Sequence, residues 1–114
     1  MNREFLVDRR GDAIHVLLTG EIDVAAGPAV GRAIRRALGM PGGDVVVNLD
    51  AVTFIDSSGL GAIVAGYHEA SSRHAAFSIG PPAVPAVARE LSTTGLREAL
   101  ILRRAVEGGT ATGT

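Results

Sequence analysis

The residues of this chain best suited to chemistry are Asp56-Ser57-Ser58-Gly59, a carboxylate followed by two hydroxyls and a glycine. A β-branched run at residues 45–49 comes before them and predicts a strand, while apolar residues at helical spacing come after them and predict a helix. The two hydroxyls would then lie where a helix presents unpaired backbone N–H groups. Such a place can hold a phosphate, or one of its serines can receive one.

One enzymatic interpretation of this segment is a serine hydrolase, in which a base would have to activate Ser57 or Ser58. Neither serine has glycine two positions away on both sides, as the hydrolase nucleophile requires. His68 and His74 follow the serines by about ten residues or more, which is about 15 Å of helix. The third histidine, His15, lies in a predicted strand. A hydrolase is therefore the weaker hypothesis, and we expect a protein that is not an enzyme.

The sequence contains no pattern typical of a cofactor or metal site. The glycine-rich loop ending in lysine and a hydroxyl residue, which wraps nucleotide phosphates, is absent. No pair of histidines stands at ligand spacing with a carboxylate. We therefore expect neither a cofactor nor a metal ion.

Composition limits the class of protein further. The 114 residues are 46% hydrophobic with a formal net charge of −1, which fits one folded domain with a single core. Basic residues form no patch that would attract nucleic acid. No apolar run approaches the roughly 18 residues of a membrane span, and the first residues do not resemble a signal peptide. There is no cysteine, so we expect a cytoplasmic protein with no membrane or direct nucleic-acid partner.

The remaining elements follow from apolar spacing and from turn residues. Strands at 5–7 and 13–18, on either side of the turn Arg10-Gly11-Asp12, predict an opening hairpin. A helix is expected near Pro28, ending in the Gly- and Pro-rich stretch 39–43. Further strands are predicted at 75–79 and 100–102, a third helix at 84–91, and a flexible tail at 104–114. This alternation predicts one α/β domain, a mixed sheet of four to five strands packed with three to four helices.

Small residues line up beside the apolar stripe of the helix that follows the serines. The stripe consists of Leu60, Ile63, Val64 and Tyr67, and the small residues beside it are Gly59, Ala62, Gly66 and Ala70. We therefore expect another part of the chain to approach this helix closely, with Gly59 and Gly61 allowing that approach. At the helix start, either serine could act as the N-cap by accepting from an N–H two or three residues on.

Four blocks of the sequence together resemble the STAS domain. They are Gly20-Glu21-Ile22-Asp23, Val47-Asn48-Leu49, residues 54–61 and Thr94-Gly95-Leu96, in the order and spacing of that family. The resemblance covers residues 4–103 and is greatest to free-standing bacterial anti-sigma factor antagonists. It departs from the family at 73–76 and 80–83, where a glycine pair and a Ser-Pro opening of the third helix are more usual. These differences leave the serine site intact.

The resemblance implies a regulatory substrate. In this family an anti-sigma factor that is also a serine kinase phosphorylates the first residue after the aspartate, which is Ser57 here, with Ser58 as the second choice. The unphosphorylated antagonist binds the anti-sigma factor and frees the sigma factor, and a metal-dependent phosphoserine phosphatase reverses the modification. The implied contact surface consists of Asp23, Asp56, Ser57, Ser58, Gly59, Leu60 and Gly61.

Less specific interpretations stay open at this point. Asp23 and Asp56 could be ordinary carboxylates that satisfy nearby N–H groups. Ser57 could be only a helix cap, in a STAS module that serves as a scaffold or as a transport-system subunit and has no cognate kinase. A monomer and a weak dimer are both compatible with the sequence.

A phosphate on Ser57 would act on partner binding more than on folding. It adds about −1.5 to −2 charges, which a helix N-terminus favours by roughly 0.3–1 kcal/mol and which the neighbouring Asp56 opposes. Like charges across an interface cost several kcal/mol, and about 3 kcal/mol is more than a hundredfold in affinity. We therefore expect little change in the fold and a large change in affinity.

Overall fold

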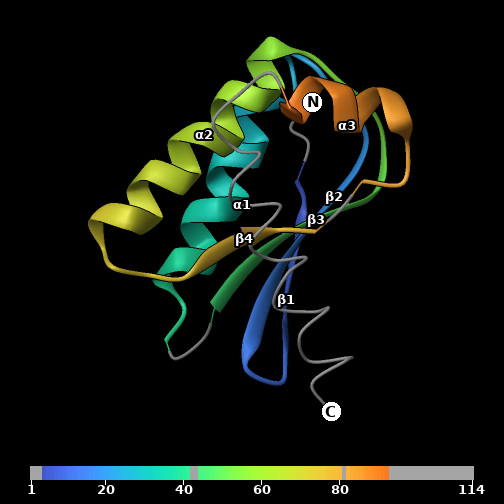
Figure 1. Ribbon diagram of the computed structural model, residues 1–114. Helices are drawn as coiled ribbons and strands as arrows, with labels where there is room; N and C mark the ends of the chain where they lie inside the picture. Colours follow the sequence, from blue (N-terminus) through green and yellow to red (C-terminus); the bar gives the residue numbers. More distant parts are fainter. Residues whose placement is uncertain (1–3, 42–43, 81, 93–114) are drawn as a thin grey trace.

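The computed structural model describes residues 4–41, 44–80 and 82–92 (Figure 1). In chain order its elements are β1 Leu6–Arg10, β2 Ala13–Ile22, α1 Gly27–Gly39, β3 Asp44–Ile55, α2 Ser57–Ser72, β4 Phe77–Ile79 and α3 Pro85–Ser92. Each of these was predicted as a helix or a strand of the same type. The strand expected at 100–102, the block Thr94-Gly95-Leu96 and the tail expected at 104–114 lie outside the described residues.

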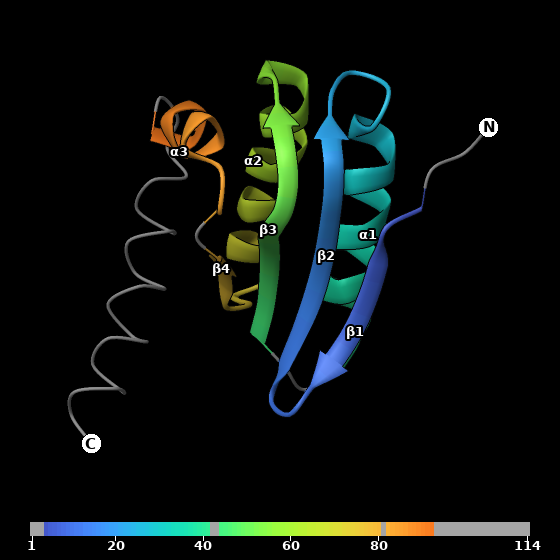
Figure 2. The ribbon, with the colours of Figure 1, turned by 90° about the vertical axis from the view of Figure 1, so that its right-hand side faces the viewer.

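The four strands form one mixed sheet in the order β1-β2-β3-β4, which confirms the predicted α/β fold class. β1 and β2 are antiparallel, as expected of the opening hairpin, and Gly11 in its turn has a φ of +61° that glycine adopts without strain. β2, β3 and β4 run parallel to one another, joined through α1 and α2. Both helices cover the same face of the sheet and lie behind it in Figure 2. α3 packs against β3.

β3 is longer than its sequence pattern indicates. The pattern predicts a strand ending at Leu49, whereas the strand continues to Ile55. Beyond Leu49 only Val52 and Ile55 are buried, and this spacing of three hides the alternation typical of a half-buried strand. The register with β2 shifts twice along this stretch, which accommodates the irregular spacing.

The hydrophobic core lies between the sheet and the helices α1 and α2. Its largest fully buried side chains come from the strands and the helices alike, namely Ile14, Leu18, Ile22, Ile34, Leu49, Ile63, Ile79 and Leu91. Gly66 of α2 faces α1, because a Cβ added there would lie 2.8 Å from both Cδ1 and Cγ2 of Ile34. The expected close approach to this helix is therefore confirmed.

Two glycines near the start of α2 differ in their surroundings. A Cβ added at Gly59 would lie 2.5 Å from the carbonyl oxygen of Ile22 and 2.6 Å from its Cγ2. Only glycine lets α2 sit this close to the end of β2. At Gly61 nothing lies within 4 Å of an added Cβ, so the expectation that Gly61 allows a close approach is wrong.

We predict opposite effects of alanine at these two positions. Gly59→Ala should lower the free energy of unfolding by about 1–3 kcal/mol, because a backbone carbonyl cannot easily move away from the new methyl group. Gly61→Ala should leave it unchanged or raise it by up to about 1 kcal/mol, because alanine is the better helix former. Denaturant unfolding of both variants measures the difference, and equal destabilisation would contradict the packing described.

Candidate functional site

The candidate site lies where the two central parallel strands end side by side. Ile22 of β2 pairs with Ile55 of β3, and the N–H of Asp56 donates to the carbonyl of Ile22 at 3.2 Å. Each strand then turns into a helix, α1 after β2 and α2 after β3 (Figure 2). A Cβ added at Gly27 would lie 3.8 Å from the carbonyl oxygen of Ser58, so the two helix N-termini are adjacent. Carboxyl ends of parallel strands commonly carry binding sites.

Asp56 is the N-cap of α2. Its backbone is extended, and its Oδ1 accepts a hydrogen bond from the N–H of Gly59 at 3.0 Å. Its carbonyl accepts from the N–H of Leu60 at 2.9 Å. The carboxylate thus satisfies one of the donors that a helix start leaves unpaired. The interpretation of Ser57 or Ser58 as the cap is therefore wrong, because Asp56 holds that position one residue earlier.

Ser57 and Ser58 are the first two residues of α2, and both are exposed. Neither hydroxyl forms a hydrogen bond within the part of the chain that the structure describes. A negative charge added at Ser57 would meet the positive end of the helix dipole, opposed by the carboxylate of the neighbouring cap, Asp56. Ser57 is therefore accessible to a modifying enzyme and is not needed to begin the helix.

Asp23 holds the turn between β2 and α1. Its Oδ1 accepts from the N–H groups of Ala25 at 3.1 Å and of Ala26 at 3.3 Å. Ala26 is the N-cap of α1 and α1 has no side-chain cap, so the Asp23 side chain orders the turn that leads into this helix. The interpretation of Asp23 as a turn carboxylate is confirmed, and the structure also places it at the same end of the sheet as Asp56.

The other predicted contact residues divide between surface and interior. Gly61 is exposed, whereas Gly59 and Leu60 are buried, Leu60 to 3% exposure. Sequence reasoning missed two apolar residues at this end, Val24 and Phe54, which are 70% and 49% exposed. In the sequence, each is an apolar residue next to a polar turn or strand end. Neither continues the apolar spacing of a helix or a strand.

No histidine stands within reach of the serines in the described structure. His68 lies eleven residues after Ser57 on α2, about 16 Å along the helix axis, and His74 follows the end of that helix. His15 pairs with Val46 in the first half of β3, away from the strand ends. The described residues also contain no group of three His, Cys, Asp or Glu side chains that could hold a metal ion. None of the described helices is long and apolar enough to span a membrane.

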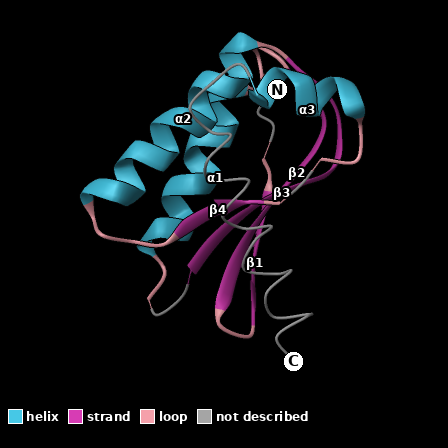
Figure 3. Cartoon of the chain, in the orientation of Figure 1, coloured by secondary structure: helices cyan, strands magenta, loops and turns pink. Residues whose placement is uncertain are grey.

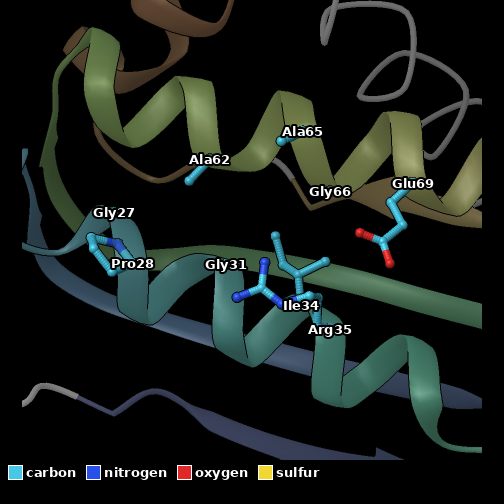
Figure 4. A pocket seen from close by; sticks show the side chains of 9 residues that line it. All are labelled: Gly27, Pro28, Gly31, Ile34, Arg35, Ala62, Ala65, Gly66 and Glu69. Atoms are coloured by element: carbon cyan, nitrogen blue, oxygen red, sulfur yellow. The ribbon is translucent and has the colours of Figure 1, made fainter.

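An open groove of about 210 Å³ runs between α1 and α2 (Figure 4). It is lined mostly by small and apolar residues, namely Gly27, Pro28, Gly31, Ile34, Arg35, Ala62, Ala65, Gly66 and Glu69. Its acidic residue, Glu69, is already paired with Arg73 at 2.6 Å. The lining contains no serine, cysteine or histidine, so the groove adds no nucleophile or base to the serine end.

Residues 5–103, most of the chain, match the family described as "Mlab, STAS domain". The chain belongs to the STAS domain family. A comparison with curated proteins gave no match.

Solved structures of anti-sigma factor antagonists resemble this STAS domain. One from Mycobacterium paratuberculosis is 30% identical, with a TM-score of 0.73 over 82% of this chain and 79% of that one. The Bacillus cell fate determinant SpoIIAA in its phosphorylated form is 21% identical, with a TM-score of 0.64 over 83% of this chain and 86% of that one. At this identity the likeness shows the fold alone. Mglu is 28% identical with a TM-score of 0.60 over 68% of this chain, which spans only 19% of Mglu.

We predict that the cap, and not the serine, stabilises this STAS domain. Asp56→Ala should lower the free energy of unfolding by about 1 kcal/mol, because α2 loses its capping oxygen. Ser57→Ala should change it by less than about 0.5 kcal/mol, and Asp56→Asn, which keeps an accepting oxygen, should recover most of the loss. Urea titrations give all three values; a larger loss for Ser57→Ala than for Asp56→Ala would refute the assignment.

Proposed function

We propose that this STAS domain is an anti-sigma factor antagonist. When unphosphorylated, it binds an anti-sigma factor that is also a serine kinase, and a sigma factor is thereby freed. Phosphorylation of Ser57 ends the binding, and a phosphoserine phosphatase restores it. The chain is then a switch and a substrate, with no catalysis of its own.

The observation that carries this proposal is that the residue capping α2 and the proposed phosphate acceptor, Ser57, are different residues. Asp56 bonds the N–H of Gly59 and begins the helix, whereas Ser57 is exposed. A kinase can therefore modify Ser57 without removing an interaction that the fold needs. The likeness to an anti-sigma factor antagonist that is 30% identical supports the same function.

The proposed contact surface is the end of the sheet at which β2 and β3 become helices. Asp23, Asp56, Ser57, Ser58 and Gly61 would contribute to it directly. Gly59 and Leu60 are buried under this surface, so their contribution would be to fix the first turn of α2. A partner bound here would cover Ser57, which makes the charge at this residue decisive for binding.

Two variants of Ser57 test the proposed switch. Ser57→Asp should bind the anti-sigma factor about tenfold or more weakly than wild type, and only partly mimic phosphorylation because it carries one charge against about two. Its melting temperature should stay near that of wild type, since a carboxylate at this end of a helix is tolerated. Ser57→Ala should bind like wild type. Titration calorimetry and thermal melting measure these quantities, and unfolding of Ser57→Asp would contradict the account.

Capture from a native lysate with the same two baits separates this function from a STAS module outside sigma control. The proposal predicts a kinase-type anti-sigma factor on the Ser57→Ala bait that is depleted on the Ser57→Asp bait. Equal capture of the same proteins on both baits, transporter subunits among them, would instead indicate a constitutive scaffold or a transport-system subunit.

A further inference from the structure

Large apolar side chains are exposed close to the ends of the two central strands. Among the described residues, Leu6, Val24 and Phe54 are the large hydrophobic residues with high exposure, at 64%, 70% and 49%. Phe54 precedes Ser57 by three residues, at most about 11 Å of chain. Val24 comes two residues after Ile22, whose carbonyl accepts from the N–H that leads into α2. Phe54 pairs with Glu21 in the sheet, three residues before Val24, so both positions belong to the same end of the central strands. Exposed large apolar side chains at one end of a sheet indicate an interaction surface.

The backbone holds both side chains outward. The neighbour of Phe54, Ile55, is buried and points toward Gly59, so Phe54 stands on the opposite face of the strand. Val24 follows Asp23, whose carboxylate accepts from the two N–H groups after Val24 and so fixes the turn around it. The exposure of these two side chains is therefore a property of the folded turn and strand end.

The ionised side chains of the two segments that contain the ends of β2 and β3 are all acidic. In residues 19–28 and 51–62 they are Glu21, Asp23 and Asp56, and these segments contain no lysine or arginine. Within these segments, a phosphate on Ser57 would meet backbone N–H groups at the helix starts and no cationic side chain. In water this is tolerable, but a partner that covers the surface must dehydrate the phosphate without a cation from these two segments, which is costly.

We propose that Val24 and Phe54 are the apolar anchors of the interface with the anti-sigma factor. By excluding water from the surroundings of Ser57, they make dehydration of the phosphate the main reason why phosphorylation breaks the complex. This inference rests on the proposed function. It requires that the surface of the anti-sigma factor opposite these two side chains is apolar. Affinity then comes from the anchors and regulation from Ser57 beside them.

The response to salt distinguishes this mechanism from repulsion between like charges. Repulsion is screened, because the Debye length falls from about 10 Å at 0.1 M salt to about 3 Å at 1 M. Dehydration is not screened in this way. The loss of affinity caused by Ser57→Asp should therefore agree within about twofold at 0.1 M and 1 M sodium chloride. Disappearance of the loss at 1 M would overturn the inference.

Binding of full-length variants to purified kinase-type anti-sigma factors of the same organism, one at a time, tests the anchors. Phe54→Ala and Val24→Ala should each weaken binding about tenfold or more, because truncation removes a buried apolar contact. Leu6→Ala is the matched control, since Leu6 is as exposed but lies on the edge strand β1. It should change affinity by less than about twofold, and all three melting temperatures should stay near that of wild type.

A double-mutant cycle links the anchors to the switch. In the Phe54→Ala background, the affinity loss caused by Ser57→Asp should shrink by about threefold or more, because water then reaches residue 57. An equal loss in both backgrounds would mean that the anchor and the charge act independently, and would overturn the proposed coupling.

The outcomes separate failure of the inference from failure of the proposed function. If the wild-type chain binds none of the kinase-type anti-sigma factors, the proposed function fails and the inference fails with it. If wild type binds and both anchor variants bind equally well, the inference alone fails. If Phe54→Ala instead dissolves a dimer seen by light scattering while the affinity for the anti-sigma factor is unchanged, the patch serves a second copy of the chain, which also overturns the inference.

Discussion

The contact between the first turn of α2 and the last residue of β2 is the constraint on which this end of the molecule depends. The N–H of Asp56 bonds the Ile22 carbonyl at 3.2 Å, and a Cβ at Gly59 would come within 2.5 Å of the same oxygen. The start of this helix is capped by the Asp56 side chain, and its close approach requires a glycine three residues later. Ser57 and Ser58 are the two positions left between them, and neither side chain is used by the described fold.

This division of roles explains how a switch can coexist with a stable domain. The energy that begins α2 comes from Asp56 and the close packing at Gly59, so a change of charge at Ser57 costs the fold little. The same change lies at an exposed end of the sheet that also exposes Val24 and Phe54, where a bound partner would have to accommodate it. In the proposed function the consequences of phosphorylation are therefore felt in binding, while the domain stays folded in both states.

Most of the fold could be predicted from the sequence because its helices and strands have strong and regular apolar spacing. The end of β3 could not, since Val52 and Ile55 are buried three residues apart and the register with β2 shifts there. The identity of the cap was equally hidden, because aspartate and serine are both good N-caps and stand next to each other. Exposure of Val24 and Phe54 depends on the folded turn and strand end, which local spacing does not encode.

The most direct test of the account is to locate the phosphate after the folded chain is incubated with ATP and a purified kinase-type anti-sigma factor of the same organism. Peptide mass spectrometry of the wild type, with Ser57→Ala and Ser58→Ala beside it, identifies the residue that carries the phosphate. The account predicts one phosphate, on Ser57, which is lost in Ser57→Ala and kept in Ser58→Ala. Phosphate on Ser58 alone, or none with any kinase-type anti-sigma factor, would contradict it.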